Sequence, residues 1–318
     1  MQMVNAAGAR MPFRPIQPID PFGRGAPDDG RLLEGYAHLL EESGEYKVLR
    51  RLAPKVSPPF RAPNTRTAVF VDVEVDPDTG HVVEMAAVPF QYAASGRVIA
   101  VHEPVVQVRE PSRPAGSPRT SPVGPGGEAP AREVDATAFE ALAARASLAV
   151  AHNAAFDRPV VEALLPAFAL LPWACSLRDV PWTTDRSRIL KLPSLAAANG
   201  FFYDCHHARD DCLAAIELLS RPLRHGGGPA MRSLLDRAGR ETARIWAVGA
   251  PYERKDVLRR RGYRWSNGAD GRPRAWFVEV DAEARDAEMR FLRAQVFGRD
   301  LDLPTDRVTA YERYSARG

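Results

Sequence analysis

The sequence predicts an α/β protein with a mixed sheet flanked by helices. Strand patterns come first, and helical and strand patterns then alternate, which is the order typical of that class. Apolar runs bounded by turn-forming residues predict three strands, at 67–74, 81–92 and 97–108. Further on, a short apolar strand at 147–153 lies between helical patterns at 136–146 and 154–168. We expect these segments to form one sheet with helices on its faces.

The first 66 residues are expected to form a leader, a helical hairpin and a linker. Residues 1–30 are rich in Pro, Gly and Asp and have no sustained period. Apolar residues at helical spacing predict one helix over 31–42 and a second over 46–52. Prolines in the stretch 53–66 predict a linker that ends at a domain boundary.

Two more segments complete the predicted organisation. Residues 110–132 are rich in Pro, Gly and Ser and are expected to form a loop inserted in the sheet domain. Over 243–314 the patterns follow the order strand, helix, strand, strand, helix, strand, which is the ferredoxin-like arrangement of a small α+β domain. We therefore expect a leader with hairpin and linker (1–66), a sheet domain (67–222) and a basic α+β domain (223–318).

Charge is segregated along the chain. Residues 67–220 carry 12 basic and 19 acidic side chains, whereas residues 221–318 carry 21 basic and 14 acidic ones. This segregation is typical of a site for cations beside a surface that meets polyanions, although solvated charge asymmetry is a common alternative. No apolar run approaches the roughly 18 residues of a membrane span, so we expect a cytoplasmic protein with no membrane partner.

Carboxylates stand where the predicted strands end. Asp72 and Glu74 are two residues apart on an apolar strand, so both side chains project from the same face. Asp157 comes one turn into the helix that follows the strand at 147–153. The alternative interpretation is that these are an exposed strand end and an ordinary first-turn aspartate, which the helix dipole favours.

The stretch "FFYDCHHARDDC" (201–212) adds a further acid. In a helix over 208–219, steps of about 100° per residue place the apolar residues on one face: Ala208, Cys212, Ala215, Ile216 and Leu219. Asp211 borders that face, whereas Asp210 points the opposite way. We therefore expect Asp211 alone to reach the sheet. Ligation of a soft metal by Cys205 and Cys212 is disfavoured because Cys212 lies on the apolar face.

Four carboxylates in one crevice require compensation by hard divalent cations, for which Mg²⁺ is the default and Mn²⁺ the substitute. Two such ions about 3.5–4 Å apart clamp the attacking and leaving oxygens of a phosphodiester, so the reaction class is metal-assisted hydrolysis. A histidine near the start of the last helix is then a candidate base for the attacking water.

Three ordered motifs resemble those of the DnaQ-like, or DEDDh, 3′–5′ exonucleases. They are "FVDVEVDPDTGHVVEMAAV" (70–88), "AHNAAFDRPVVEAL" (151–164) and "HHARDDCLAAIELL" (206–219), and the resemblance covers about Thr67 to Pro222. It implies a ribonuclease H-like fold. It also assigns roles by position, with His206, five residues before the last aspartate, as general base and four metal-binding acids: Asp72, Glu74, Asp157 and Asp211.

The resemblance implies release of nucleoside 5′-monophosphates from a 3′ end, with single-stranded DNA as the expected partner and DNA repair as a possible role. An exoribonuclease of the same chemistry is one alternative. A nucleic-acid-binding adaptor with weakened activity is another, because Val75, Asp76 and Pro77 replace a Thr-Thr-Gly found in many members. The intact acids and His206 favour an enzyme.

Further residues are candidates for contacts with nucleic acid. Basic side chains interleaved with aromatic ones are typical of single-strand binding, although buried aromatics beside a solvated arginine face give the same pattern. We also expect Asn153 to cap its helix. The candidates are Asn153, Phe156, Lys255, Arg259, Arg260, Arg264 and Trp265.

Overall fold

The computed structural model describes residues 29–58, 60, 62–108, 136–183, 191–224, 226–269 and 271–317. The chain forms two compact units, Met1–Val48 and Leu49–Gly318, which are described separately. The predicted leader up to residue 28 and the predicted loop at 110–132 lie outside the described residues. The predicted boundaries at residues 66 and 222 stay predictions.

The first unit contains one described helix, α1 (Asp29–Glu42), as the leucine spacing predicts. The helix ends before Gly44, whose φ of 73° lies in the left-handed region that glycine adopts without a steric penalty. The predicted second helix over 46–52 is absent from the described chain, so the helical hairpin was wrong.

Residues after Val48 join the second unit as extended chain. Strand β1 (Arg50–Arg51) pairs in parallel with β9 (Phe201–Phe202), and Leu52 packs against the main core. The backbone N–H of Leu52 donates to the Phe202 carbonyl at 2.8 Å. Because this pairing partner is some 150 residues away in the chain, local helical periodicity could not reveal it.

The second unit is built on a seven-stranded mixed sheet. Its strands run in the order β2-β5-β4-β3-β7-β8, and β6 pairs with β4 beyond the end of β5. Strand β3 pairs antiparallel with β4 and parallel with β7. The strands are β2 (Val56–Ser57), β3 (Thr65–Val75), β4 (Val82–Ala93), β5 (Val98–His102), β6 (Val105–Val108), β7 (Leu148–Ala151) and β8 (Trp173–Cys175).

Two details of this sheet differ from the prediction. The single strand expected over 97–108 is divided at Pro104 into β5 and β6, and both parts pair with β4. Proline lacks the N–H that a continuous ladder needs. In addition, β2 lies within the stretch 53–66 that was expected to be a linker, and it pairs in parallel with β5 as an edge strand.

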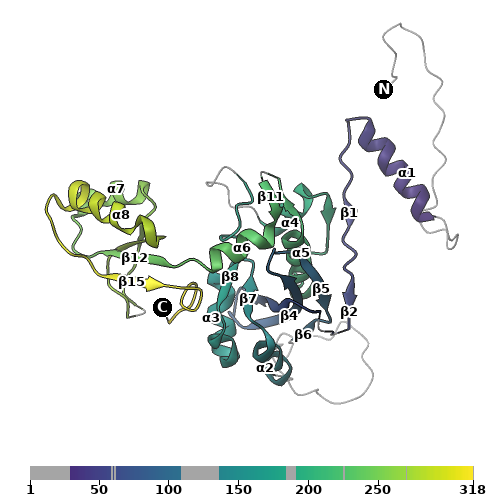
Figure 1. The fold of residues 1–318 in the computed structure, drawn as a ribbon, viewed down its shortest axis with the longest axis horizontal. Coiled ribbons are helices and arrows are strands. Elements are labelled where there is room, and N and C mark those ends of the chain that lie inside the picture. The colour runs from purple at the N-terminus through teal and green to yellow at the C-terminus, as the bar shows by residue number, and fades with distance from the viewer. Residues whose placement is uncertain are drawn as a thin grey trace, which may run out of the picture. The chain divides into compact units, whose positions relative to one another are not determined.

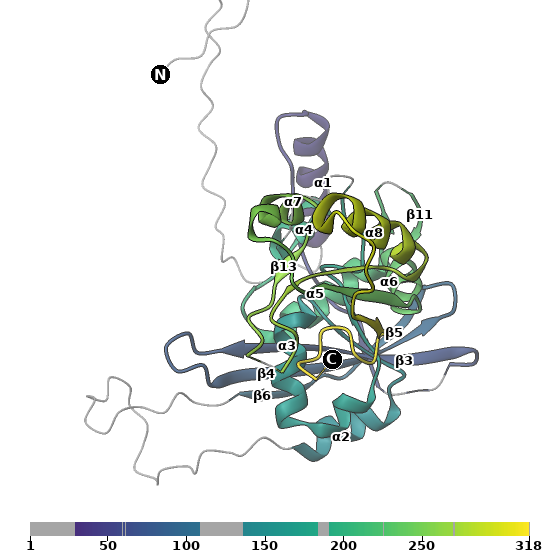
Figure 2. The ribbon, with the colours of Figure 1, turned by 90° about the vertical axis from the view of Figure 1, so that its left-hand side faces the viewer.

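Helices cover both faces of the sheet, so the predicted α/β architecture is confirmed. Figure 2 shows α2 on one side of the long strands β3 and β4, and α5 and α6 on the other. Alternate residues of β3 serve the two cores, with Phe70 facing α5 and Val71 facing α2 and α3. The helices are α2 (Ala136–Arg145), α3 (Ala154–Leu164), α4 (Leu192–Ala198), α5 (Ala208–Ser220) and α6 (Ala230–Ala238). A 3-10 turn (Pro166–Leu170) follows α3, and a small ribbon joins β10 (Pro222–Leu223) to β11 (Gly226–Pro229).

The C-terminal region has the predicted order β-α-β-β-α-β. Its four strands form an antiparallel sheet in the order β13-β14-β12-β15. Figure 1 shows α7 and α8 together on one side of it, where Ile245, Leu258 and Met289 share a third core. The elements are β12 (Thr242–Ala247), α7 (Lys255–Arg260), β13 (Arg264–Trp265), β14 (Trp276–Asp281), α8 (Arg285–Phe291) with a π-helical end (Leu292–Phe297), and β15 (Thr305–Val308). Short 3-10 turns, Tyr252–Arg254 and Ala282–Ala284, precede α7 and α8.

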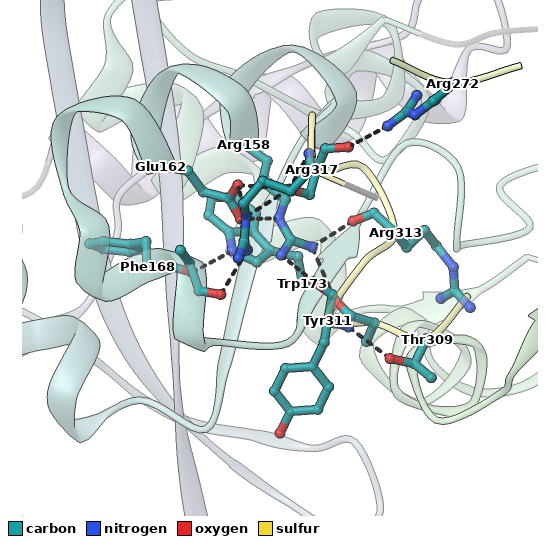
Figure 3. Close-up of polar contacts among 12 residues, drawn as sticks. Arg158, Glu162, Phe168, Trp173, Arg272, Thr309, Tyr311, Arg313 and Arg317 are labelled. Atoms are coloured by element: carbon teal, nitrogen blue, oxygen red, sulfur yellow. Dashed lines mark hydrogen bonds and ion pairs between the residues drawn. The ribbon is translucent and has the colours of Figure 1, made fainter. Parts of the chain in front are cut away.

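The last residues of the chain return to the main sheet and pack against α3 (Figure 3). Arg158, which is fully buried, donates from its guanidinium to the carbonyls of Ala310, Tyr311 and Arg313 at 3.1, 2.6 and 2.6 Å. Its Nε also donates to Glu162 at 2.6 Å, which compensates the buried charge. One side chain therefore ties the C-terminal segment to the helix that carries Asp157.

No helix in the described parts of the chain has the length and apolar character needed to cross a membrane.

We predict that Arg158→Ala lowers the free energy of unfolding by about 3–5 kcal/mol. The substitution removes the donor to three backbone carbonyls and to the Glu162 carboxylate. Urea denaturation of the full chain measures the change. The matched control is Arg145→Ala at the exposed end of α2, where a change within about 0.5 kcal/mol is expected. Equal effects of the two substitutions would contradict the anchoring role of Arg158.

Candidate metal centre

The register of the β3–β4 hairpin places three carboxylates on the face of the sheet that α5 covers. Asp72 and Glu74 follow Phe70 at two-residue intervals on β3, so they share its face. Glu74 is paired directly opposite Glu84 on β4. Like charges directly opposite each other destabilise a hairpin, so repulsion between Glu74 and Glu84 destabilises this end of the sheet.

Helix α5 brings a further carboxylate to this face. The five residues expected on its apolar side are all buried, and Asp211 at the border of that side is 9% exposed. Asp210 is half-buried and binds Arg209 at 3.2 Å instead. The predicted helix register is therefore confirmed, and it separates two adjacent aspartates into different environments.

Asp211 is oriented by two donors. The Tyr203 hydroxyl donates to its Oδ1 at 2.5 Å, and the His206 backbone N–H donates to its Oδ2 at 2.9 Å. These hydrogen bonds leave further lone pairs on both carboxylate oxygens. Asp211 is thus held in one orientation while it can still bind a cation.

Asp72, Glu74 and Asp211 form a cluster whose nearest oxygens all lie within 4.8 Å of one another. Ligand oxygens bound to one Mg²⁺ or Ca²⁺ ion lie about 2.0–2.6 Å from it, so neighbouring oxygens separated by up to roughly twice that distance can share the ion. Purely oxygen ligands suit hard cations. This acid triad can therefore hold a metal ion.

Asp157 joins the site from the opposite helix layer through the backbone of β3. Pairing between β3 and β7 ends at Phe70 and Val150, so the N–H of Val73 has no partner strand beyond that point. This N–H donates to Asp157 Oδ1 at 3.2 Å. The carboxylate, which is 3% exposed, thereby lies at the junction where the two parallel strands separate.

Burial and mutual repulsion make the carboxylates hard to ionise in the metal-free protein. Desolvation, followed by the charges of Asp157 and Asp211, raises the pKa of Asp72 well above its ordinary value. Desolvation raises the pKa of Asp157 to about 7. It also raises the pKa values of Glu74 and Asp211 above their ordinary values. A bound cation removes this cost, because it favours the charged form of every carboxylate.

Strained backbone occurs at the entrance of both helices that carry site acids. Asn153, immediately before α3, has a φ of 96°, and His206, two residues before α5, has a φ of 67°. Non-glycine residues in this region cost on the order of 1–3 kcal/mol and cluster at functional sites. His206 is exposed, and its backbone N–H is tied to Asp211 as described above.

The predicted cap at Asn153 was only half right. Asn153 occupies the N-cap position, but its side chain makes no capping hydrogen bond. The backbone supplies the first turn instead, with the N–H of Phe156 donating to the Asn153 carbonyl at 2.7 Å. The left-handed conformation turns the side chain away from the geometry that a cap requires.

Most of the residues that were predicted to contact nucleic acid do not lie next to the acid triad in the sequence or the fold. Phe156, 44% exposed, precedes Asp157 on α3. The remaining five lie in the C-terminal region, on or next to α7 and β13: Lys255, Arg259, Arg260, Arg264 and Trp265.

These C-terminal side chains have local partners. Lys255 donates to the Tyr252 hydroxyl at 2.7 Å, and Arg259 lies over the Trp276 ring at 5.5 Å. Trp265 is half exposed and meets Trp276 edge to face. They form an exposed basic and aromatic surface rather than part of the acid cluster.

Sequence reasoning missed Glu84 and Tyr203. Glu84 adds to the field that raises the pKa of Asp72, and His207 lies 3.8 Å from it. The alternation along β4 indicates which face Glu84 occupies. Its position opposite Glu74 depends on the hairpin register, which the sequence alone does not give. Nothing in the local sequence around Tyr203 indicates a bond to Asp211.

The cysteines take no part in the cluster. Cys175, Cys205 and Cys212 are all free, and Cys212 is fully buried on the sheet-facing side of α5. Desolvation and then the charge of Asp72 raise the pKa of its thiol well above the ordinary value. A neutral buried thiol is a poor metal ligand.

Comparisons with known proteins give no relative for the chain. No protein-family model matches it, and neither a curated protein nor a solved structure does so.

We predict that the metal-free protein loses stability as pH rises from about 4 to about 7. The pKa of Asp157 is higher in the folded chain, so the unfolded chain binds fewer protons over this window and gains relative stability as pH rises. The expected loss from this group is on the order of 4 kcal/mol. Urea titrations in chelator measure it, and Asp157→Asn should flatten the profile. A profile that rises with pH would contradict the assignment.

We also predict that Mg²⁺ or Mn²⁺ raises the melting temperature at pH 8, since a ligand of the folded state stabilises it, by about 2.7 kcal/mol at 100 times Kd. Asp211→Asn should abolish most of this increase. The matched control Asp210→Asn removes a charge one residue away and should retain it. Equal loss in both variants would point to general charge screening.

Proposed function

We propose that the chain is a metal-dependent 3′–5′ exonuclease that releases nucleoside 5′-monophosphates from the end of a DNA strand. The observation that carries the proposal is the convergence of Asp72, Glu74 and Asp211 within 4.8 Å, with Asp157 joined through Val73. These are the four acids that the DEDDh resemblance assigns to metal binding. The mixed sheet flanked by helices suits the ribonuclease H-like fold that the same resemblance implies.

The four acids are proposed to hold two Mg²⁺ ions, with Mn²⁺ as a substitute. When bound, such ions supply the positive charge that stabilises the phosphate in its transition state and lowers the pKa of a water ligand. The triad provides one ligand set, and Asp157 lies close enough to interact electrostatically with Asp72. Tyr203 holds Asp211 in place and so acts as a positioning residue.

His206 is the proposed general base. Its side chain is exposed at the mouth of the site, where it interacts favourably with the charges of Glu74 and Asp211. Because its backbone is bonded to Asp211, the imidazole is carried by the same loop that orients a metal ligand. The imidazole takes the proton from the attacking water and passes it to solvent.

The substrate side of the site is proposed to use exposed groups next to the acids. Phe156, which is exposed and precedes Asp157 on α3, is proposed to stack on a terminal base, an interaction worth about 1–3 kcal/mol. The side-chain amide of Asn153 makes no capping bond and is available to a nucleotide. The basic surface on α7 and β13 is proposed to attract the strand.

The test is release of mononucleotides from 3′-labelled single-stranded DNA and RNA by the purified full chain. We expect release from DNA in Mg²⁺ and none in chelator. His206→Ala should slow release by about 10²–10⁴-fold, the usual contribution of a general base. Asp211→Asn should reduce it by at least about 100-fold, since it removes a metal ligand.

Asp210→Asn is the matched control and should leave release nearly unchanged. Loss of activity in this variant together with full activity in Asp211→Asn would overturn the site assignment. Faster release from RNA than from DNA would identify an exoribonuclease. Binding without release in every metal tested would identify an adaptor instead.

A further inference from the structure

Exposed apolar side chains gather at one end of the C-terminal sheet. Trp265 of β13, Trp276 of β14 and Ala247 of β12 are register partners in one row across the strands. Trp265 is 51% exposed, and Val248 and Tyr252, which follow β12, are 43% and 74% exposed. Apolar groups that stay exposed together in one place are typical of an interaction surface.

Cationic side chains lie between the aromatic rings of this cluster. The Lys255 ammonium lies 4.1 Å from the centroid of the Tyr252 ring and donates to its hydroxyl at 2.7 Å. Arg259 is one turn further along α7 and shares a side of the helix with Lys255. Its guanidinium lies 5.5 Å from the centroid of the Trp276 ring, which meets the Trp265 ring edge to face at 5.6 Å. These contacts join into one aromatic–cation stripe, in the order Tyr252, Lys255, Arg259, Trp276 and Trp265.

The segment that carries most of the stripe has an excess of positive charge. Residues 252–265 include six basic and two acidic side chains. Even when Glu279 and Glu288, which pair with two of these arginines from outside the segment, are counted, an excess of two positive charges remains. Arg259 lies 3.6 Å from Asp256, but both side chains are more than 60% exposed. Such a pair is weak, so a phosphate can take the place of Asp256.

The alternation of rings and cations matches the chemistry of a single nucleic-acid strand. In a single strand the faces of the bases are open to stacking, and a phosphate lies between each base and the next. In a duplex the bases stack on one another, which closes these faces to a protein ring. The positive charge favours a polyanion over an apolar protein surface as the partner.

We propose that the aromatic–cation stripe binds single-stranded nucleic acid, with bases stacked on Tyr252 and Trp265 and the phosphates between them on Lys255 and Arg259. Every base has an aromatic face, so this binding is independent of sequence. The substrate class is then a single strand or a duplex with a single-stranded extension, rather than a blunt duplex. The inference rests on the proposed function only in taking this strand to be the substrate.

The test is fluorescence anisotropy of the full chain with a labelled oligothymidylate longer than about 16 nucleotides, the upper end of the site size of one oligonucleotide-binding domain. Chelator is present so that no metal-dependent hydrolysis occurs. Trp265→Ala and Tyr252→Ala should each weaken binding at least about fivefold, the loss expected for one stacked base. Trp265→Phe should retain most of the affinity, because an aromatic ring remains. Arg259→Gln should reduce the salt dependence of log K by about 0.7, the value for one phosphate contact on a single strand.

Tyr311→Ala and Arg145→Gln are the matched controls, because each changes an exposed side chain of the same kind outside the stripe. Both variants should bind as the unsubstituted chain does. Equal weakening in the controls would overturn the proposal, and so would a blunt duplex that binds as tightly as the single strand.

Two further outcomes separate this proposal from the exonuclease proposal. Oligothymidylate binding that requires Trp265, in a chain that releases no mononucleotide in Mg²⁺, would support the stripe and refute the exonuclease. Mononucleotide release in Mg²⁺ together with binding that Trp265→Ala leaves unchanged would refute the stripe alone.

Discussion

Repulsion among carboxylates at the end of β3 is the constraint on which the organisation of the second unit depends. Asp72 and Glu74 of β3 and Asp211 of α5 place their nearest oxygens within 4.8 Å of one another, and the charge of Asp157 at the start of α3 acts on Asp72 as well. The packing of both sheet faces holds these elements together despite that cost, because the hydrophobic cores on either side are continuous up to the acids. A divalent cation converts the same arrangement from an electrostatic penalty into a binding site.

The fold restrains each of these elements from a second direction. Helix α3 is held on its outer side by Arg158, which gathers the C-terminal segment around it (Figure 3). The loop before α5 is held by Tyr203 and by the parallel pairing of β9 with β1. The C-terminal region thus contributes to the position of an acid to which it has no direct bond.

Local periodicity was sufficient to predict the class of fold and the division between Asp210 and Asp211, because a helix of known start has a fixed angular step. It could not predict contacts set by pairing across long sequence distances. Arg50 and Arg51 lie in a segment with helical periodicity, yet they form β1, which pairs with β9 at Phe201–Phe202. Glu84 enters the site only because the hairpin register places it opposite Glu74.

The most direct test of the metal centre is an anomalous difference map from crystals of the full chain grown with Mn²⁺. The account predicts strong peaks within about 2.0–2.4 Å of carboxylate oxygens of Asp72, Glu74 and Asp211, with Asp157 at a ligand or near-ligand distance. Tyr203 and His206 should keep their bonds to Asp211. Mn²⁺ bound elsewhere, or an acid triad that stays free of Mn²⁺ at saturating concentration, would contradict the account.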